Sequence, residues 1–308
     1  MGRIGEALRR AGTVRPGSQT LSPPTDQERV FASPWKFDDL ERVIAPAESP
    51  AERRKPTEVP LGEPVIRRRP QQAITERFRS EWKARLSVGA GADPALAEQF
   101  RRLAATLLHS QRADRLKIIL VTSAVPDEGK TLASVNLSLI LSESYGRRVL
   151  LVDADLRRPS IGSVANLEVN DGLSEAVTAS EDREIPVVQL SDTLTLLPAG
   201  RPLADPLSGL SSPRMTRLLE QAATQYDWVI IDTPPLAAAA DAGLLCEIAD
   251  AALLVVRVNS TPQAAIQRAI DTLGRDRILG VILNGVEASE TTAYHTYGYA
   301  ADEPIPNE

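Results

Sequence analysis

The sequence predicts an α/β fold, with a mostly parallel, doubly wound sheet that carries helices on both faces. From residue 93 onward, short apolar runs alternate with segments of helical periodicity, which is the order that a parallel sheet requires. These runs are apolar at consecutive positions, as expected for strands that are buried on both faces. The chain has 308 residues, of which 43% are hydrophobic, so it is able to form a sizeable core.

The expected elements follow one another between residues 93 and 283. Asp93 followed by Pro94 is typical of a helix start, and Gly146 is typical of a helix end. Thr261 and Pro262 begin a later helix. Strands are expected at 116–123, 148–155, 194–198, 228–233, 251–258 and 278–283, with helices from residue 93, at 130–145, at 213–226 and after residue 262.

Residues 1–92 are expected to form a basic, Pro-rich and largely disordered leader. Residues 1–90 carry 17 Lys and Arg against 12 Asp and Glu, whereas the rest of the chain carries 18 against 29. Ten of the 23 prolines lie in the leader and interrupt any long helix, so only short helices are expected, at 3–10 and 75–86. The predicted α/β domain spans 93–286, and a flexible tail that bears tyrosines spans 287–308.

Composition excludes several kinds of protein. The single cysteine, Cys246, excludes an internal disulfide framework and a thiolate metal site. We find neither a secretory signal nor an uncharged apolar stretch of ~20 residues, so we expect a cytoplasmic protein. The charge run RRRP at 67–70 is either a solvated linker or a contact for anionic lipid or a partner.

A phosphate-binding loop of the P-loop NTPase type is expected where the sequence is SAVPDEGKTL. This segment links a strand to a helix, and helix N-termini at such positions bind anions. Lys130 is the candidate for neutralising the β- and γ-phosphates, and Thr131 for offering its hydroxyl to Mg²⁺. Ala124 stands where the general pattern has glycine, and the alternative is an ordinary helix cap with a surface lysine. The backbone N–H groups expected to bind the nucleotide belong to Asp127, Glu128, Gly129, Lys130, Thr131 and Leu132.

Three acidic residues at strand ends are the candidate metal and catalytic residues. Asp153 and Asp155 lie two positions apart in LLVDADLRRP, so both side chains are expected on one side of the strand. Two carboxylates so close repel each other unless a cation such as nucleotide-bound Mg²⁺ compensates. Asp232 ends the run WVIID and suits a water or hydroxyl in the Mg²⁺ shell. The alternative for each residue is a carboxylate solvated at a strand end.

Tyr294, Tyr297 and Tyr299 form a cluster in a polar segment near the end of the chain. Because only 4% of the residues are aromatic, this clustering indicates a function. Exposed phenols attached to an ATP site are expected to accept a phosphoryl group. The alternative is a tail that docks on its own domain through these rings.

Residues from about 93 to 299 resemble the bacterial tyrosine kinases (BY-kinases) of polysaccharide export, in their cytoplasmic autokinase form. The resemblance rests on VPDEGKT, on LLVDADLRRP as a second Walker A-like motif, on VIIDTPP as the Walker B motif, and on the tyrosine cluster. The opening MGRIGEALRRAG and the Pro-rich leader resemble the exosortase-associated tyrosine autokinases.

This resemblance implies a kinase that uses ATP and Mg²⁺ and phosphorylates its tail tyrosines in trans within a ring. Carried over by position, Lys130 and Thr131 hold phosphate and Mg²⁺, while the three aspartates organise the metal and the receiving hydroxyl. Asp153 is expected to draw the proton from tyrosine. Asn284 matches a position that contacts adenine in related folds, although before Gly285 it also suits a turn.

The ring-forming pattern ExxRxxR of this family is only partly present. Glu98 and Arg101 match it, but Ala104 occupies the last position and Arg102 is the nearest alternative. Without ring formation, this helix would simply present a solvated charged face. The implied partners are a second copy of the chain, a membrane activator of the chain-length-determinant type and a tyrosine phosphatase, with no nucleic acid. Such an activator would hold the protein at the inner face of the membrane.

Two other functions are compatible with an ATP site. One is a positioning ATPase of the ParA and MinD type, and the other is a regulator that binds ATP without modifying any substrate. ParA and MinD carry a lysine early in the loop, where this chain has Val125, and they need no tyrosine tail. Formation of phosphotyrosine would separate the three functions.

Overall fold

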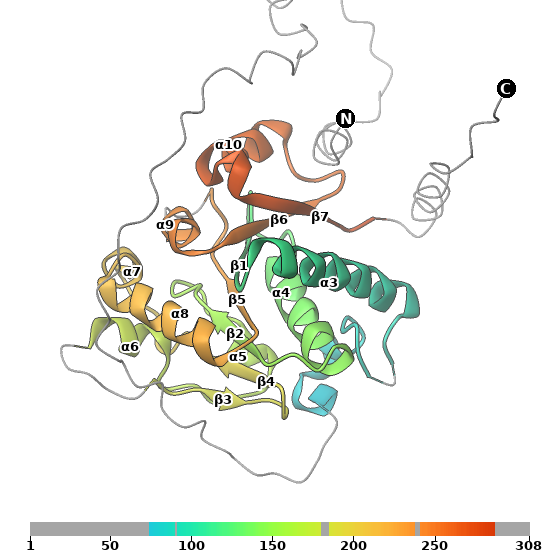
Figure 1. Cartoon of the computed structure of the whole chain (residues 1–308), viewed down its shortest axis with the longest axis horizontal. Coiled ribbons are helices and arrows are strands. Elements are labelled where there is room, and N and C mark those ends of the chain that lie inside the picture. Colours follow the sequence, from blue (N-terminus) through green and yellow to red (C-terminus); the bar gives the residue numbers. More distant parts are fainter. Residues whose placement is uncertain (1–73, 90, 180–184, 238–240, 287–308) are drawn as a thin grey trace, which may run out of the picture. The chain divides into compact units, whose positions relative to one another are not determined.

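Seven strands form a single sheet in the computed structural model, which describes residues 74–89, 91–179, 185–237 and 241–286 (Figure 1). The strand order is β3-β4-β2-β5-β1-β6-β7. Neighbouring strands are parallel except at one edge, where β3 pairs antiparallel with β4. The predicted α/β class, with a mostly parallel and doubly wound sheet, is therefore confirmed.

The strands lie within about two residues of the ranges that the apolar runs predict, and β3 is an addition to them. The strands are β1 (Ile118–Ser123), β2 (Val149–Asp153), β3 (Val188–Gln189), β4 (Leu194–Leu197), β5 (Trp228–Asp232), β6 (Ala251–Arg257) and β7 (Ile278–Asn284). The helices are η3 (Ile74–Arg77), α2 (Ser80–Lys83), α3 (Pro94–Asp114), α4 (Lys130–Leu139), η4 (Ile140–Ser144), α5 (Ile161–Val164), α6 (Leu173–Thr178), α7 (Pro206–Leu210), α8 (Pro213–Gln225), α9 (Asp241–Ile248), α10 (Gln263–Leu273) and η5 (Arg275–Arg277).

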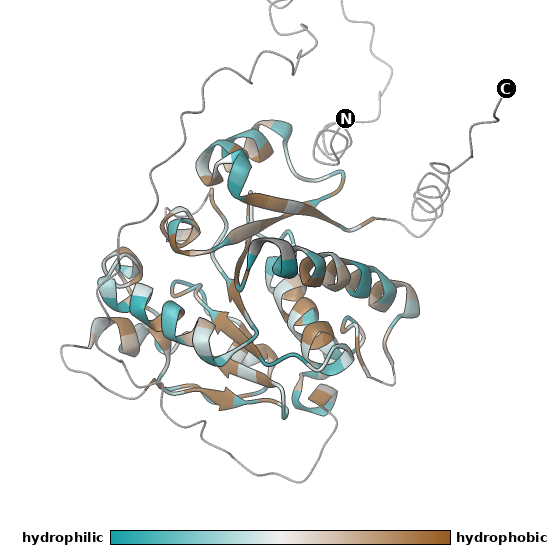
Figure 2. Ribbon diagram, viewed as in Figure 1, coloured by the Kyte–Doolittle hydropathy of each residue, from teal (hydrophilic) through white to brown (hydrophobic). Residues whose placement is uncertain are grey.

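The sheet buries apolar side chains on both faces, because successive residues of a strand point to opposite sides. Along β1, Leu120 faces one helical layer and Ile119 faces the other. The layer on the Leu120 side includes α8, α9 and α10, and the layer on the Ile119 side includes α3 and α4. Figure 2 shows strands that are hydrophobic along most of their length, whereas α3, α8 and α10 combine hydrophobic and hydrophilic residues.

Two predicted helix boundaries have their expected chemistry. The side chain of Asp93 caps α3 by accepting a hydrogen bond from the backbone N–H of Ala95 at 2.9 Å, and Pro94 occupies the first helical position. Helix α4 continues through η4 as a short π-helical segment and ends before Gly146, whose φ of 61° is left-handed.

Residues 74–89 belong to the predicted leader, and they pack against the layer of α3 and α4. Phe78 and Leu86 are buried in the core of this layer. The side-chain amide of Asn136 on α4 holds the segment, since it accepts from the N–H of Ser87 at 2.6 Å and donates to the carbonyl of Arg85 at 3.0 Å. The division into leader, domain and tail at residues 92 and 286 stays a prediction.

A second backbone contact links this segment to α5. The N–H of Arg79 donates to the carbonyl of Val164, the last residue of α5, at 3.1 Å. Within the described ranges, no helix combines the length and apolarity that are needed to span a bilayer.

Candidate active site

The loop between β1 and α4 has the backbone shape of an anion-binding loop. Asp127 and Gly129 have positive φ angles of 64° and 90°, and Glu128 between them does not. This alternation turns successive N–H groups toward one point and forms a nest for anions. Helix α4 begins directly after Gly129, so its N-terminal N–H groups add positive potential at the same place, with Leu132 in the first turn.

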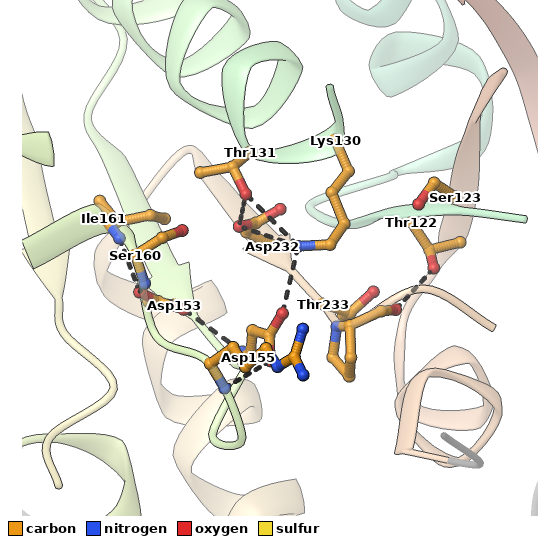
Figure 3. A network of polar contacts seen from close by, with 12 residues as sticks. Thr122, Ser123, Lys130, Thr131, Asp153, Asp155, Ser160, Ile161, Asp232 and Thr233 are labelled. Carbon is orange, nitrogen blue, oxygen red and sulfur yellow. Dashed lines mark hydrogen bonds and ion pairs between the residues drawn. The ribbon is translucent and has the colours of Figure 1, made fainter. Parts of the chain in front are cut away.

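Lys130 extends from the first turn of α4 toward two strand-end carboxylates (Figure 3). Its Nζ lies 3.2 Å from Oδ2 of Asp155 and 4.0 Å from Oδ2 of Asp232. Burial by itself lowers the pKa of Lys130, but the negative charges of Asp232, Asp155 and Asp153 together raise it above its ordinary value. The amine is therefore charged at neutral pH and suited to hold a phosphate.

Asp232 is fully buried at the end of β5, where it accepts hydrogen bonds from two hydroxyl groups of α4. Thr131 Oγ1 donates to Oδ2 at 2.7 Å, and Ser134 Oγ donates to Oδ1 at 3.1 Å. Burial raises the pKa of Asp232, and the opposing effects of Lys130 and the two hydroxyls do not cancel this rise. Ser134 was missed from the sequence, although its position three residues after Thr131 places both on one helix face.

Asp153 ends β2 directly beside Asp232, its partner in the parallel register. Its Oδ2 accepts from the N–H groups of Ser160 and Ile161, at 3.1 and 2.9 Å, where α5 begins (Figure 3). Burial, followed by the neighbouring charge of Asp232, raises the pKa of Asp153 to about 7. A carboxyl group with this pKa is matched to accept a proton near neutral pH.

The acidic centre fits a divalent cation that arrives with a nucleotide. The raised pKa values of Asp153 and Asp232 show that burial leaves their charges poorly compensated by Lys130. In the described part of the chain, no group of three or more His, Cys, Asp or Glu side chains is placed to bind a metal by itself. Mg²⁺ suits such a site, because it keeps several waters and uses one or two carboxylates together with phosphates. The metal assignments of Thr131, Asp153, Asp155 and Asp232 stay predictions.

Asn284 ends β7 and lies against the phosphate loop. Its Nδ2 donates to the carbonyl oxygen of Glu128 at 2.8 Å, and its Oδ1 accepts from the N–H of Gly285 at 2.9 Å. A Cβ at position 129 would collide with Nδ2 of Asn284 and displace that side chain, and the positive φ of Gly129 by itself favours glycine here. The contact with Gly285 fits the turn interpretation, and the predicted adenine contact stays a prediction.

Comparison with known proteins identifies the family. A family described as AAA domain matches residues 116–275. The tyrosine-protein kinase YwqD of Bacillus subtilis (strain 168) is 34% identical over 206 residues, which are 66% of this chain and 86% of YwqD. The chain belongs to the bacterial tyrosine-protein kinases.

A solved kinase domain and a longer relative are also similar to this chain. The kinase domain of the Escherichia coli tyrosine kinase Etk has a similar structure, with a TM-score of 0.59 and 28% identity over 68% of this chain and 79% of that domain. The succinoglycan biosynthesis transport protein ExoP of Rhizobium meliloti (strain 1021) is 33% identical over 210 residues, which are 65% of this chain. This kinase spans 26% of ExoP and thus corresponds to one part of that longer protein.

Family membership confirms the predicted enzyme class, a protein-tyrosine kinase, and the P-loop fold implies ATP binding. Among the predicted site residues, the structure brings together Lys130, Thr131, Asp153, Asp155 and Asp232, with Asn284 beside the loop. The predicted phosphoacceptors, Tyr294, Tyr297 and Tyr299, lie outside the described residues.

The kinase presents the predicted oligomerisation residues on the exposed surface of α3. Glu98 is the shared partner there, at 3.6 Å from Arg101 and 3.2 Å from Arg102. Exposed ion pairs of this kind contribute little to the stability of the fold. Ala104, at the last position of the ring pattern, is fully buried in the core, so it adds nothing to this surface.

Proposed function

We propose that this kinase binds ATP with Mg²⁺ and transfers the γ-phosphoryl group to tyrosines on a neighbouring copy. The observation that carries the proposal is the convergence of Lys130, Thr131 and the strand-end aspartates beside an anion-binding loop. Positioning and charge stabilisation supply most of the catalysis in phosphoryl transfer, and this arrangement offers both.

Each side chain has a separate task in this proposal. The nest and Lys130 hold the β- and γ-phosphates, and Asp155 orients the lysine through their contact of 3.2 Å. Thr131 and Asp232 hold Mg²⁺, which when bound neutralises charge that develops on the phosphate oxygens. The phenol oxygen attacks the γ-phosphorus, the bond to the β,γ-bridging oxygen breaks, and ADP leaves.

Asp153 takes the proton of the attacking phenol. Tyrosine has an unperturbed pKa near 10 and is a poor nucleophile at neutral pH without a base. The pKa of Asp153, raised to about 7, makes it a stronger base than an ordinary carboxylate while leaving it partly ionised at neutral pH. The hydrogen bonds from the N–H groups of Ser160 and Ile161 hold its Oδ2 in a defined position.

The acceptors in this proposal are Tyr294, Tyr297 and Tyr299. Tyr294 lies ten positions after Asn284, a reach of at most ~33 to 36 Å, so chain length permits transfer within one copy as well as between copies. We favour transfer between copies, with the charged surface of α3 as the contact. Three phosphates would add roughly −5 to −6 charges to each tail, and their repulsion would separate the copies again.

The biological setting follows from the names of relatives. ExoP is named for succinoglycan biosynthesis transport, and we propose that this kinase likewise regulates synthesis and export of an exopolysaccharide. A membrane activator would hold it at the inner face of the cytoplasmic membrane, and a tyrosine phosphatase would reset the tail.

The full chain, incubated with Mg²⁺ and labelled ATP, tests the chemistry. We expect label on tyrosine, none with Lys130→Ala, and little with Tyr294→Phe, Tyr297→Phe and Tyr299→Phe combined. Mixing the Lys130→Ala chain with the catalytically intact triple Phe chain tests transfer between copies. Label on the Lys130→Ala chain would show such transfer, because in this mixture only that chain carries the three acceptor tyrosines. An absence of phosphotyrosine, even with the cytoplasmic piece of a membrane activator added, would contradict the proposed function.

A further inference from the structure

The side chain of Glu128 is enclosed, although the residue belongs to the loop that must meet a ligand. Only 1% of its surface is exposed. Its Oε2 accepts from the N–H of Val125 at 2.7 Å, its Oε1 accepts from the N–H of Arg257 at 3.2 Å, and Oε1 also accepts from the hydroxyl of Thr261. Burying a carboxylate raises the free energy of the folded state unless the group is hydrogen-bonded in this way. We therefore expect the Glu128 side chain to have a specific role in the loop.

The side chain of Glu128 joins the phosphate loop to the end of β6 and to the turn that follows it. Arg257 is the last residue of β6, and Thr261 lies in the turn that leads to α10. The main chain of the loop is held from the same side, because Asn284 of β7 donates to the carbonyl of Glu128 and the Arg257 guanidinium donates to the carbonyl of Asp127 at 3.4 Å. The loop is therefore fixed to the ends of β6 and β7 as well as to β1 and α4.

We propose that Glu128 is a positioning residue, whose carboxylate sets the shape of the phosphate loop through Thr261 and the N–H of Arg257. The inference rests on the proposed function, since it concerns the same nucleotide site. Asp127 has a left-handed backbone conformation, which few residues other than glycine, asparagine and aspartate adopt. The contacts on both sides of it, at Val125 and at Glu128, hold the loop in that conformation and keep its N–H groups convergent before a phosphate arrives.

Two variants disrupt the hydrogen bond between Glu128 and Thr261, each by changing one of its two partners. Glu128→Gln keeps the size of the side chain, but its NH₂ group is unable to accept the hydrogen bonds made by one of the two carboxylate oxygens. Thr261→Val removes the hydroxyl and keeps the shape. Glu247→Gln on α9 and Thr272→Val on α10 are matched controls, because both residues are exposed and lie on neighbouring helices.

The readout is the Kd for ADP with Mg²⁺, measured by calorimetry on the full chain at a temperature where circular dichroism shows every variant folded. We expect the Kd to rise about tenfold in Glu128→Gln and in Thr261→Val, with the controls and Thr261→Ser within about twofold of the unmodified chain. The double variant should be little worse than Glu128→Gln alone, because both changes remove the same contact.

Unchanged ADP affinity in the folded variants would overturn the inference and leave the carboxylate with a role in stability alone. The inference would also be overturned if the rise in Kd in the double variant equalled the product of the rises in the two single variants. Failure of the unmodified chain to bind ADP is a different result, because it would reject the proposed function itself.

Discussion

Replacing Asp153 by Asn is expected to change the stability of the nucleotide-free kinase in opposite directions at high and low pH. The folded-state pKa of Asp153 is raised from 3.8 to about 7 by burial and by the charge of Asp232. The folded protein therefore keeps a proton that the unfolded chain releases near pH 4. The bound proton contributes to the free energy of unfolding in full below about pH 4, and this contribution is lost as the pH rises through 7.

The magnitude follows from the size of this shift. A difference of about 3 pKa units corresponds to ~4 kcal/mol of lost stability at pH 8, and asparagine avoids this loss. The NH₂ group of asparagine is unable to accept the hydrogen bond that Asp155 N donates to Oδ1 at 3.3 Å, which costs ~1 kcal/mol. Asp153→Asn should thus stabilise the protein by ~3 kcal/mol at pH 8 and destabilise it by up to ~1 kcal/mol near pH 4.

Urea unfolding in the presence of EDTA measures both values, with fluorescence of the buried Trp228 as one probe. Asp192→Asn, at an exposed position, is the matched control and should change the free energy of unfolding by less than about 0.5 kcal/mol at either pH. An effect of Asp153→Asn that has the same sign and size at both pH values would refute the reasoning, because it would show that Asp153 is not a poorly compensated buried charge.

Three further predictions concern the attachment of residues 74–89 to the core and the hydrogen bonds of Asp232. Phe78→Ala should lower the free energy of unfolding by about 3 kcal/mol, because the ring is buried in the hydrophobic core on the α3 and α4 side of the sheet. A loss under about 1 kcal/mol would show that the ring is not part of the core in solution. Asn136→Ala should release residues 79–85, so limited trypsin digestion should cut there faster than in the unmodified chain, and equal rates would contradict the contact. Ser134→Ala removes a hydrogen bond that lowers the pKa of Asp232, so the pKa of Asp232 should rise further. The midpoint of the pH dependence of ATP binding in the presence of Mg²⁺ should then move to higher pH. An unchanged pH dependence would argue against a metal role for Asp232.

Local patterns were sufficient to predict every strand of the sheet except β3, and to predict that the candidate site residues lie close together. The apolar runs predict β1, β2 and β5, and motif residues directly after these runs must meet at one edge of a parallel sheet. The proximity of Asp153 to Asp232 follows from this rule, and the paired register of β2 and β5 shows it directly. The two-residue strand β3 has no such pattern, because its length is too short for alternation to be detected.

Contacts between distant segments were not predictable from the sequence. The hydrogen bonds between Asn136 and residues 85–87 join positions about fifty residues apart, and neither partner belongs to a motif. Glu128 was expected to contribute its backbone N–H, but its side chain binds Arg257 and Thr261, which follow more than a hundred residues later. Such pairings depend on how helices and loops pack on the sheet, which periodicity does not specify.

Helix α5 connects residues 74–89 to Asp153, the base in the proposed reaction. The N–H of Ile161 at one end of this single turn donates to Asp153, and the carbonyl of Val164 at the other end accepts from Arg79. A shortened protein that starts at residue 93, where the sequence suggests the domain begins, would leave that carbonyl without its donor and uncover the apolar surface under Phe78 and Leu86. Biochemists who trim this enzyme for crystals or kinetics should therefore place the new first residue ahead of Ile74.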